Sequence, residues 1–268
     1  MALKLDACIA QHQGDRKEQQ DRVTLVGHTR QPGVALAVVA DGMGGHAGGA
    51  LAAEQVIHTL GTNFQHWSPH ESPQQLLQSS LVEAHTMIKA SRFINEKDPH
   101  STAVAVLLLP GARAVWAHCG DSRLYYFRGV HLKTRTIDHS YVEHLLRLGR
   151  ISAEEAEHHP NKNILLTSLG GREAPRVEFG QAEGLLPGDS LLLCSDGLWA
   201  YFGDEELGAL ISTGTAREVA ARLIELARAR GAGEGDNISV ALLKFLAAPK
   251  APAARPYGLH AAPSRSSS

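Results

Sequence analysis

Residues 103–118 read Ala-Val-Ala-Val-Leu-Leu-Leu-Pro-Gly-Ala-Arg-Ala-Val-Trp-Ala-His. Two apolar runs, Ala103–Leu109 and Ala112–His118, are separated by the turn dipeptide Pro110-Gly111, so this stretch predicts an antiparallel β-hairpin. Gly129 separates two further runs of the same kind. Antiparallel hairpins are therefore expected to build the sheets of this chain.

Short aliphatic or β-branched runs predict strands elsewhere. They are Leu3–Ile9, Val23–Val26, Val34–Ala40, Leu124–Phe127, Val177–Gly180, Ser190–Cys194 and Ile238–Phe245. Helix starts are indicated where Ser or Thr is followed three residues later by Glu or Gln, because the two side chains cap each other's backbone amides. This pattern occurs at Ser72–Gln75, Ser140–Glu143, Ser152–Glu155 and Thr215–Glu218.

Two longer helices are expected to cover the sheets. One spans about Ala47 to Phe64, with Leu51, Val56, Ile57 and Leu60 facing inward. The other starts at Thr215 and stops at Gly231, which suits the left-handed position after a helix. Because strands outnumber helices and cluster as hairpins, the predicted class is α+β with mainly antiparallel sheet.

Composition places this chain among ordinary globular proteins. The 268 residues carry a net charge of −2, which argues against general binding to nucleic acid or an anionic membrane. The longest apolar run has seven residues (Ala103–Leu109), against roughly 20 for a membrane span. Lys4 and Asp6 interrupt any secretion signal, and three widely separated cysteines make a disulfide framework an unfavoured prediction. We expect a cytoplasmic monomer.

The end of the chain differs in composition from the rest. Residues 247–268 are rich in Ala, Pro and Ser, which cannot bury enough apolar surface to offset the entropy of ordering. The sequence therefore predicts one domain over residues 1–246 and a disordered tail over residues 247–268.

Aspartates recur where the most apolar runs end. Asp41 follows Val34–Ala40, Asp196 follows Ser190–Ser195, Asp121 follows Val115–Gly120, and Asp236 precedes Ile238–Phe245. One Asp-Gly pair by itself indicates only a turn. If four such ends converge, however, their carboxylates repel by about 4 kcal/mol per pair at 4 Å and an effective dielectric constant of 20. Divalent cations such as Mg²⁺, Mn²⁺ or Ca²⁺ remove that repulsion.

Arg16 and Asp21 add a guanidinium and another carboxylate near the N-terminus. The planar guanidinium fork suits phosphate oxygens. Carboxylates that hold metal, with an arginine beside them, indicate metal-assisted phosphoryl chemistry.

Seven short motifs follow one another along the chain. They are Arg16-x-x-Gln19-Gln20-Asp21, Asp41-Gly42-Met43-Gly44-Gly45-His46, Ser101-Thr102, Gly120-Asp121-Ser122-Arg123, Asp138-His139-Ser140, Ser195-Asp196-Gly197-Leu198 and Gly235-Asp236-Asn237. In this order, over about residues 14–244, they resemble the bacterial form of protein phosphatase 2C, the metal-dependent serine/threonine phosphatases. Each motif is weak alone, and the ordered series is specific.

The resemblance implies an α-β-β-α sandwich of two antiparallel sheets flanked by helices. It also implies a centre of two Mn²⁺ or Mg²⁺ ions. Transferred residue by residue, Asp41 would bridge both ions and the Gly42 carbonyl would bind one of them. Asp196 and Asp236 would complete the shell of the other ion.

Three further roles follow from the same resemblance. Asp21 would hold metal-bound water, Asp121 would form a third metal site with Asp196, and Arg16 would bind the substrate phosphate. Arg16 and Asp41 are thus the expected catalytic residues. The implied activity is hydrolysis of phosphoserine and phosphothreonine in proteins by metal-activated water, in opposition to a serine/threonine kinase that shares the same targets.

Two positions depart from the family pattern. Gln19 replaces the usual Asn, which keeps the amide with one more methylene. Met43 occupies the place where many eukaryotic relatives have a histidine proposed to protonate the leaving group. The general acid is therefore left open between His46 and metal-bound water.

Three alternative functions fit the sequence less well. Residues 42–47 fit G-x-G-x-x-A, but the acidic residue of a dinucleotide site is missing about 20 residues later. Cys119 is not followed by the arginine of cysteine-dependent phosphatases, because Tyr125 stands there. An inactive relative that only binds phosphoproteins would have lost a metal-bearing aspartate, and Asp41, Asp196 and Asp236 are all present.

Overall fold

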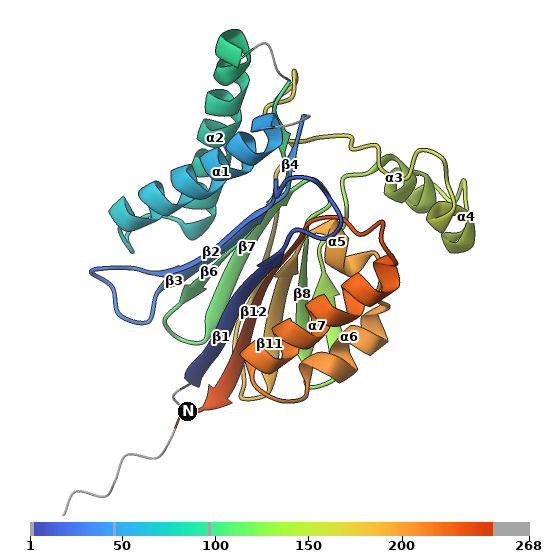
Figure 1. Ribbon diagram of the computed structural model, residues 1–268. Coiled ribbons are helices and arrows are strands. Elements are labelled where there is room, and N and C mark those ends of the chain that lie inside the picture. Colours follow the sequence, from blue (N-terminus) through green and yellow to red (C-terminus); the bar gives the residue numbers. More distant parts are fainter. Residues whose placement is uncertain (1–2, 45–46, 96–97, 249–268) are drawn as a thin grey trace, which may run out of the picture.

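Two five-stranded antiparallel sheets form the centre of the computed structural model, which describes residues 3–44, 47–95 and 98–248 (Figure 1). The first sheet contains, in spatial order, β1 (Leu3–His12), β12 (Ile238–Ala247), β11 (Asp189–Cys194), β8 (Arg123–Arg128) and β9 (His131–Arg135). The second contains β10 (Glu178–Ala182), β7 (Arg113–Cys119), β6 (Ala103–Leu109), β3 (Ala35–Ala40) and β2 (Arg22–Gly27). The predicted β6–β7 and β8–β9 hairpins are confirmed as antiparallel pairs.

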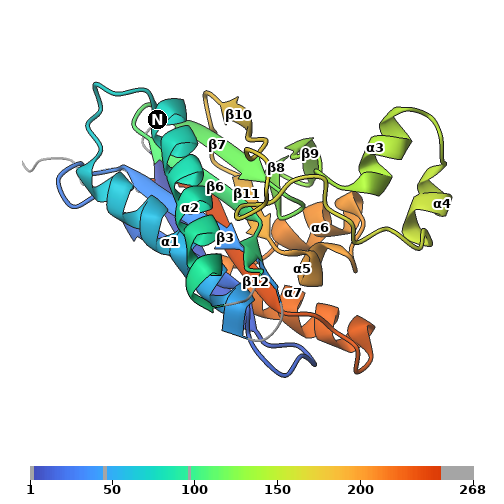
Figure 2. The same ribbon diagram turned by 90° about the horizontal axis from the view of Figure 1, so that it is seen from above.

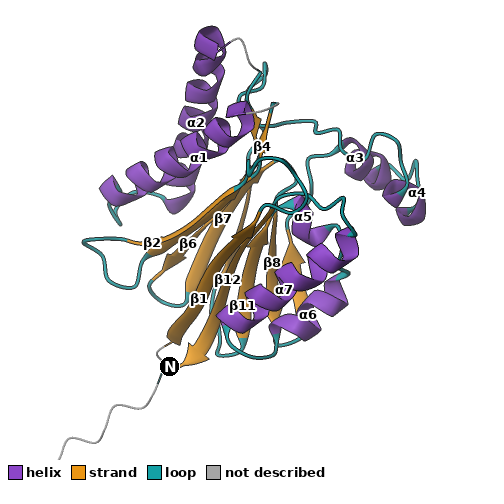
Figure 3. Cartoon of the chain, viewed as in Figure 1, coloured by secondary structure: helices purple, strands orange, loops and turns teal. Residues whose placement is uncertain are grey.

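Helices cover the outer face of each sheet (Figure 2). The second sheet packs against α1 (Ala47–His66) and α2 (Pro73–Asn95), and the first packs against α5 (Asp196–Trp199), α6 (Asp204–Ile211) and α7 (Ala216–Gly231). A third apolar core fills the space between the two sheets. The predicted α+β class and the α-β-β-α sandwich are thus confirmed (Figure 3).

The alternation of side chains along the strands explains these three cores. Along β7, Ala114 and Trp116 face the other sheet, whereas Val115 and Ala117 face the helices. Successive side chains of a strand point to opposite faces, so a strand covered on both sides must be apolar throughout. This is why β6 and β11 are buried along their whole length.

Two helix details differ from the sequence prediction. Leu51 is 58% exposed, because α1 buries Ala52, Val56 and Leu60 along a stripe that starts one residue later. The left-handed residue after α7 is Ala232, with φ of +49°, and Gly231 ends the helix. A Cβ atom at position 231 would lie 3.1 Å from the Tyr201 hydroxyl, so this glycine serves close packing.

The remaining elements lie at one end of the sandwich. β4 (Gly42–Met43) pairs with β5 (His100–Ser101), and neither short strand was predicted. A segment that projects from this end, residues 139–172, carries α3 (Tyr141–Arg147) and α4 (Ala153–Glu157) and is called the flap here (Figure 1). Ser140 and Ser152 cap these helices as predicted.

The structure bears on the predicted end of the domain and on the question of membrane-spanning helices. Ala247, expected to begin the tail, is the last residue of β12 and pairs with Leu3. Residues 249–268 lie outside the described part of the chain. None of the described helices combines the length and apolar character that crossing a bilayer requires.

Candidate active site

Five aspartates lie where strands begin or end at the end of the sandwich that carries β4 and the flap. Asp21 directly precedes β2, Asp41 joins β3 to β4, Asp121 joins β7 to β8, Asp196 begins α5 after β11, and Asp236 lies two residues before β12. These strands belong to both sheets. Both sheets thus contribute carboxylates to the same end of the sandwich.

The charges of the other four aspartates act on Asp41. Its pKa lies well above the usual value because the side chain is buried and because the negative charges of Asp21, Asp196, Asp121 and Asp236 act on it. Burial and neighbouring carboxylates likewise raise the pKa of Asp196 to about 6. The structure therefore brings together the strand-end aspartates that the sequence singled out.

Backbone contacts fix the position of Asp41. Its N–H donates to Thr102 Oγ1 at 3.1 Å, and its carbonyl accepts from Thr102 N–H at 2.8 Å. Next to it, a Cβ atom on Gly42 would lie 2.0 Å from the Gly49 carbonyl oxygen. Only glycine permits this approach of β4 to the start of α1.

Asp21 is the least exposed of these five aspartates, with 1% of the residue exposed. Ser195 Oγ donates to its Oδ2 at 2.6 Å, and Gln11 Nε2 donates to its backbone oxygen at 3.1 Å. Burial raises the pKa of Asp21 to about 8, while the Ser195 hydrogen bond acts in the opposite direction. A buried carboxylate with few donors needs a cation close by to remain ionised at neutral pH.

Arg16 lies on the exposed side of the cluster. Its guanidinium donates to Asp236 Oδ2 at 2.5 Å, and the side chains are 61% and 36% exposed. The negative charges of Asp196 and Asp41 also act on it and, after Asp236, help to raise its pKa. A charged, accessible guanidinium therefore stands at the mouth of a carboxylate site.

Asn237 holds the loop that carries Arg16. Its Nδ2 donates to the carbonyl oxygens of Gln13 (2.8 Å) and Glu18 (3.0 Å), and its Oδ1 accepts from Gln20 N–H at 2.7 Å. The loop is thus tied at three points to the residue that follows Asp236. Two hydrogen bonds between Asp15 and Gly235, each of 2.8 Å, add to these ties and hold the loop beside the carboxylates.

Asp121 is positioned from its backbone. Its carbonyl accepts from Trp199 Nε1 at 2.9 Å, and the Arg123 guanidinium lies 3.5 Å from the centre of the Trp199 ring. Arg123 also makes two hydrogen bonds to Asp138, of 2.8 and 2.7 Å. These contacts hold the Arg123 guanidinium in place, so it is not available to bind substrate.

The donor set fits divalent cations. It consists of carboxylates, with the backbone carbonyl of Gly42 beside them, and such hard oxygen ligands suit Mg²⁺ and Mn²⁺. The charges of five aspartates converge. Arg16 acts on Asp236, Asp196 and Asp41, and Arg123, which is also paired with Asp138, acts on Asp121. Two arginines do not balance the charge of five carboxylates.

Sequence reasoning assigned no role to Ser195, Asn237 or Trp199. Ser195 and Asn237 stand next to Asp196 and Asp236 within the quoted motifs, which was the available signal, whereas nothing near Trp199 pointed to a contact with Asp121. His46, one of the two candidates for the general acid, lies outside the described residues.

Comparison with known sequences gives a consistent result. The family model described as "Protein phosphatase 2C" matches residues 10–246. Protein phosphatase PhpP of Streptococcus pneumoniae is 32% identical over 245 residues, covering 86% of this chain and 93% of that protein. Serine/threonine protein phosphatase PstP of Mycobacterium tuberculosis is 37% identical over 213 residues, covering 78% of this chain and 40% of that longer protein.

Solved structures show the same similarity. The serine/threonine phosphatase of S. agalactiae superposes with a TM-score of 0.82 at 29% identity, covering 90% of this chain and 99% of that one. The catalytic domain of PstP in complex with two manganese ions gives a TM-score of 0.76 at 32% identity, covering 92% of this chain and 100% of that one.

Proposed function

This chain belongs to the protein phosphatase 2C family, and on that premise we propose that its clustered aspartates hold a dinuclear metal centre at which phosphoserine and phosphothreonine are hydrolysed. The chain is a bacterial-type serine/threonine protein phosphatase, and its cofactor is Mn²⁺ or Mg²⁺. The dinuclear arrangement, the roles of single residues and the partners form the proposal.

The observation that carries the proposal is the convergence of Asp41 with Asp21, Asp121, Asp196 and Asp236 at one end of the sandwich. We assign Asp41 to both ions, the Gly42 carbonyl to one ion, and Asp196 with Asp236 to the other. Asp21 would orient water, and Asp121 with Asp196 would hold a third ion. When bound, the ions supply an activated water for attack on phosphorus and neutralise the phosphoryl oxygens.

Arg16 is assigned to the substrate phosphate. Its guanidinium is exposed and reaches the edge of the carboxylate cluster at Asp236, so a phosphate entering from solvent meets it first. Two parallel N–H donors can then orient the phosphate. Because Asp236 would share its charge with a cation, the fork is free to exchange a carboxylate for a phosphate.

The proposal extends to the biological setting. We infer that the substrates are phosphorylated proteins, that a serine/threonine kinase acts on the same targets, and that the flap beside the site selects among them. The catalytic domain is assigned to residues 1–246, and we expect it to act as a cytoplasmic monomer.

The test is hydrolysis of p-nitrophenyl phosphate by the purified chain with Mn²⁺, with Mg²⁺ and with EDTA. Asp196→Ala should abolish turnover, while Asp204→Ala, an aspartate at the start of α6 that pairs with Arg135, should leave it unchanged. Turnover in EDTA, or full activity of Asp196→Ala, would contradict the metal assignment. Folded protein that is inactive with every metal would favour the relative that only binds phosphoproteins.

A further inference from the structure

A second group of potential metal ligands lies beside the carboxylate cluster, at the base of the flap. His118 is the last residue but one of β7, His139 precedes the N-cap of α3, and Glu178 begins β10. One donor atom of each residue lies within 4.8 Å of the others. The group contains two imidazoles and one carboxylate, whereas the aspartate cluster offers oxygen ligands.

Two nitrogens in this group are buried without a hydrogen-bond partner. They are Nδ1 of His118 and Nε2 of His139, in residues that are 3% and 5% exposed. A buried polar atom without a partner costs about 1–3 kcal/mol. Such atoms are rare in folded proteins and call for an ion, a water or another ligand.

The tautomer of His118 leaves one ring nitrogen free to bind a metal. Its Nε2 donates to the Ile137 carbonyl at 2.8 Å, which leaves the lone pair on Nδ1, the nitrogen that has no partner. Histidines that bind metal commonly donate their other ring N–H to a backbone carbonyl in this way. Burial lowers the pKa of His118, and burial with the neighbouring His118 lowers that of His139 to about 4, so both rings are neutral at pH 7.

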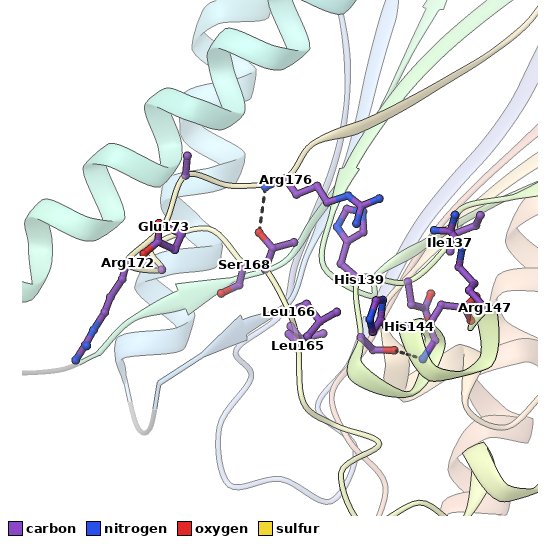
Figure 4. A pocket seen from close by; sticks show the side chains of 16 residues that line it. Ile137, His139, His144, Arg147, Leu165, Leu166, Ser168, Arg172, Glu173 and Arg176 are labelled. Carbon is purple, nitrogen blue, oxygen red and sulfur yellow. Dashed lines mark hydrogen bonds between the residues drawn. The ribbon is translucent and has the colours of Figure 1, made fainter. Parts of the chain in front are cut away.

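We propose that His118, His139 and Glu178 bind a borderline transition-metal cation of the Zn²⁺ class, in a site separate from the aspartate cluster. Two imidazoles and a carboxylate favour such a cation over Mg²⁺ or Mn²⁺. Three protein ligands leave one tetrahedral position open, and His139 lines a pocket of about 390 Å³ from which a water or small ligand can fill it (Figure 4).

Binding at this site alters three contacts of the metal-free structure. The rings of His118 and His139 are stacked, with centroids 4.6 Å apart and planes at 21°, so one ring must turn before both can direct a nitrogen lone pair at the same ion. His139 Nδ1 accepts from Gly120 N–H at 3.2 Å, so coordination through Nε2 moves the ring proton to Nδ1 and breaks this hydrogen bond. Glu178 must also exchange its ion pair with Arg176 for the cation. Because Gly120 precedes Asp121, an occupied site disturbs the loop that carries this aspartate, and Zn²⁺ is expected to reduce phosphatase activity.

Calorimetric titration of Zn²⁺ into the full chain saturated with Mn²⁺ tests the proposal. We expect one Zn²⁺ per chain, with the dissociation constant raised at least about tenfold by His118→Gln or Glu178→Gln. Glu178 is partly exposed, so its substitution tests the site even if the buried His118 variant does not fold. His144→Gln, which changes an exposed histidine of the same pocket, is the matched control.

Arg176→Gln provides a test of opposite sign. This exposed arginine pairs with Glu178, and removing its charge frees the carboxylate and lowers the repulsion of a cation, so zinc should bind more tightly. Asp196→Ala should retain the site, which separates this proposal from the assignment of the catalytic metals. The proposal is overturned if Mn²⁺-saturated protein binds no Zn²⁺, or if the affinity is the same in Glu178→Gln and His144→Gln.

Discussion

Ser195 Oγ donates a 2.6 Å hydrogen bond to Asp21 Oδ2 across the two sheets of the sandwich. Ser195 follows β11 of one sheet, Asp21 precedes β2 of the other, and neither residue is more than 1% exposed. The same hydroxyl oxygen accepts from Ser239 N–H at 2.9 Å. This serine therefore joins three segments at the point where the carboxylates meet.

Ser195→Ala is expected to lower both stability and activity. It removes one donor from the buried Asp21 carboxylate, which keeps its side-chain hydrogen bond with Ser239, and it leaves the Ser239 N–H without its partner, at a cost of about 1–3 kcal/mol. Turnover of p-nitrophenyl phosphate with Mn²⁺ should fall about tenfold if the loss of this hydrogen bond raises the activation free energy by about 1.4 kcal/mol. Urea denaturation measures the first effect, and Ser190→Ala, at a buried serine within β11, is the control. An active variant of unchanged stability would show that the bond has no such role.

Arg16→Ala should act mainly on KM. The substitution removes donors to the substrate phosphate but leaves the carboxylates in place, so uniform binding is lost. Hydrogen bonds to charged groups contribute about 1.5–3 kcal/mol, which corresponds to a rise in KM of about 10- to 150-fold. Steady-state kinetics measure this effect. Lys17→Ala is the control, because it removes an exposed positive charge from the same loop without removing the donors of Arg16. A fall in kcat at unchanged KM would exclude the assignment.

Asp41→Asn should stabilise the metal-free protein while it abolishes turnover. The pKa of Asp41 is raised by burial and by its neighbours, so the folded state binds this proton more tightly than the unfolded state. Stability from this group is present below about pH 4 and is lost as pH rises toward the folded pKa, because the unfolded state then releases its proton first. The variant does not titrate, and each unit of raised pKa is worth about 1.4 kcal/mol.

Thermal denaturation in EDTA at pH 4 and pH 8 checks this prediction. The melting temperature of Asp41→Asn should exceed that of the unaltered chain at pH 8 by about 2–4 °C per kcal/mol, and the difference should shrink at pH 4. Excess Mn²⁺ at pH 8 should reverse the order, since only the unaltered chain keeps the ligand. Equal melting temperatures in EDTA at pH 8 would show that burial and the neighbouring carboxylates do not destabilise the ionised Asp41 side chain.

The tail is expected to be dispensable for the chemistry. Residues 250–268 follow the end of β12 at Ala247, which lies at the opposite end of the sandwich from the aspartates (Figure 1). A chain truncated after Pro249 should therefore hydrolyse p-nitrophenyl phosphate with unchanged kcat and KM. A change in either constant would contradict the assignment of the catalytic domain to residues 1–246.

The sequence predicted those features that depend on local pattern. Apolar runs gave the central strands, and aspartates at their ends gave the carboxylates of the site, because the end of a strand can be recognised without knowing its neighbours. Contacts between distant segments leave no such pattern. Asp21 and Ser195 are 174 residues apart, and the group of His118, His139 and Glu178 draws on three separate segments without a ligand spacing. The predicted inward position of Leu51 was wrong, because a shift of one residue along a helix rotates the side chain by about 100° around the helix axis.

Asn237 should act on the substrate through Arg16. Its three hydrogen bonds hold the loop of residues 13–20 beside Asp236, and Asn237→Ala removes all of them. Each lost bond costs about 0.5–1.5 kcal/mol, so the loop no longer presents Arg16 in one position. KM is therefore expected to rise, as it does for Arg16→Ala, with kcat less affected.

A double-mutant cycle separates positioning from a direct role. If Asn237 acts only by placing Arg16, the Arg16→Ala and Asn237→Ala changes are not additive, and the double variant loses no more kcat/KM than Arg16→Ala alone. If Asn237 instead supports Asp236 and its metal, the losses add and the Mn²⁺ concentration needed for half-maximal activity rises. Measuring kcat/KM and this Mn²⁺ requirement for all four proteins distinguishes the two, because a displaced loop alters the first quantity and leaves the second unchanged.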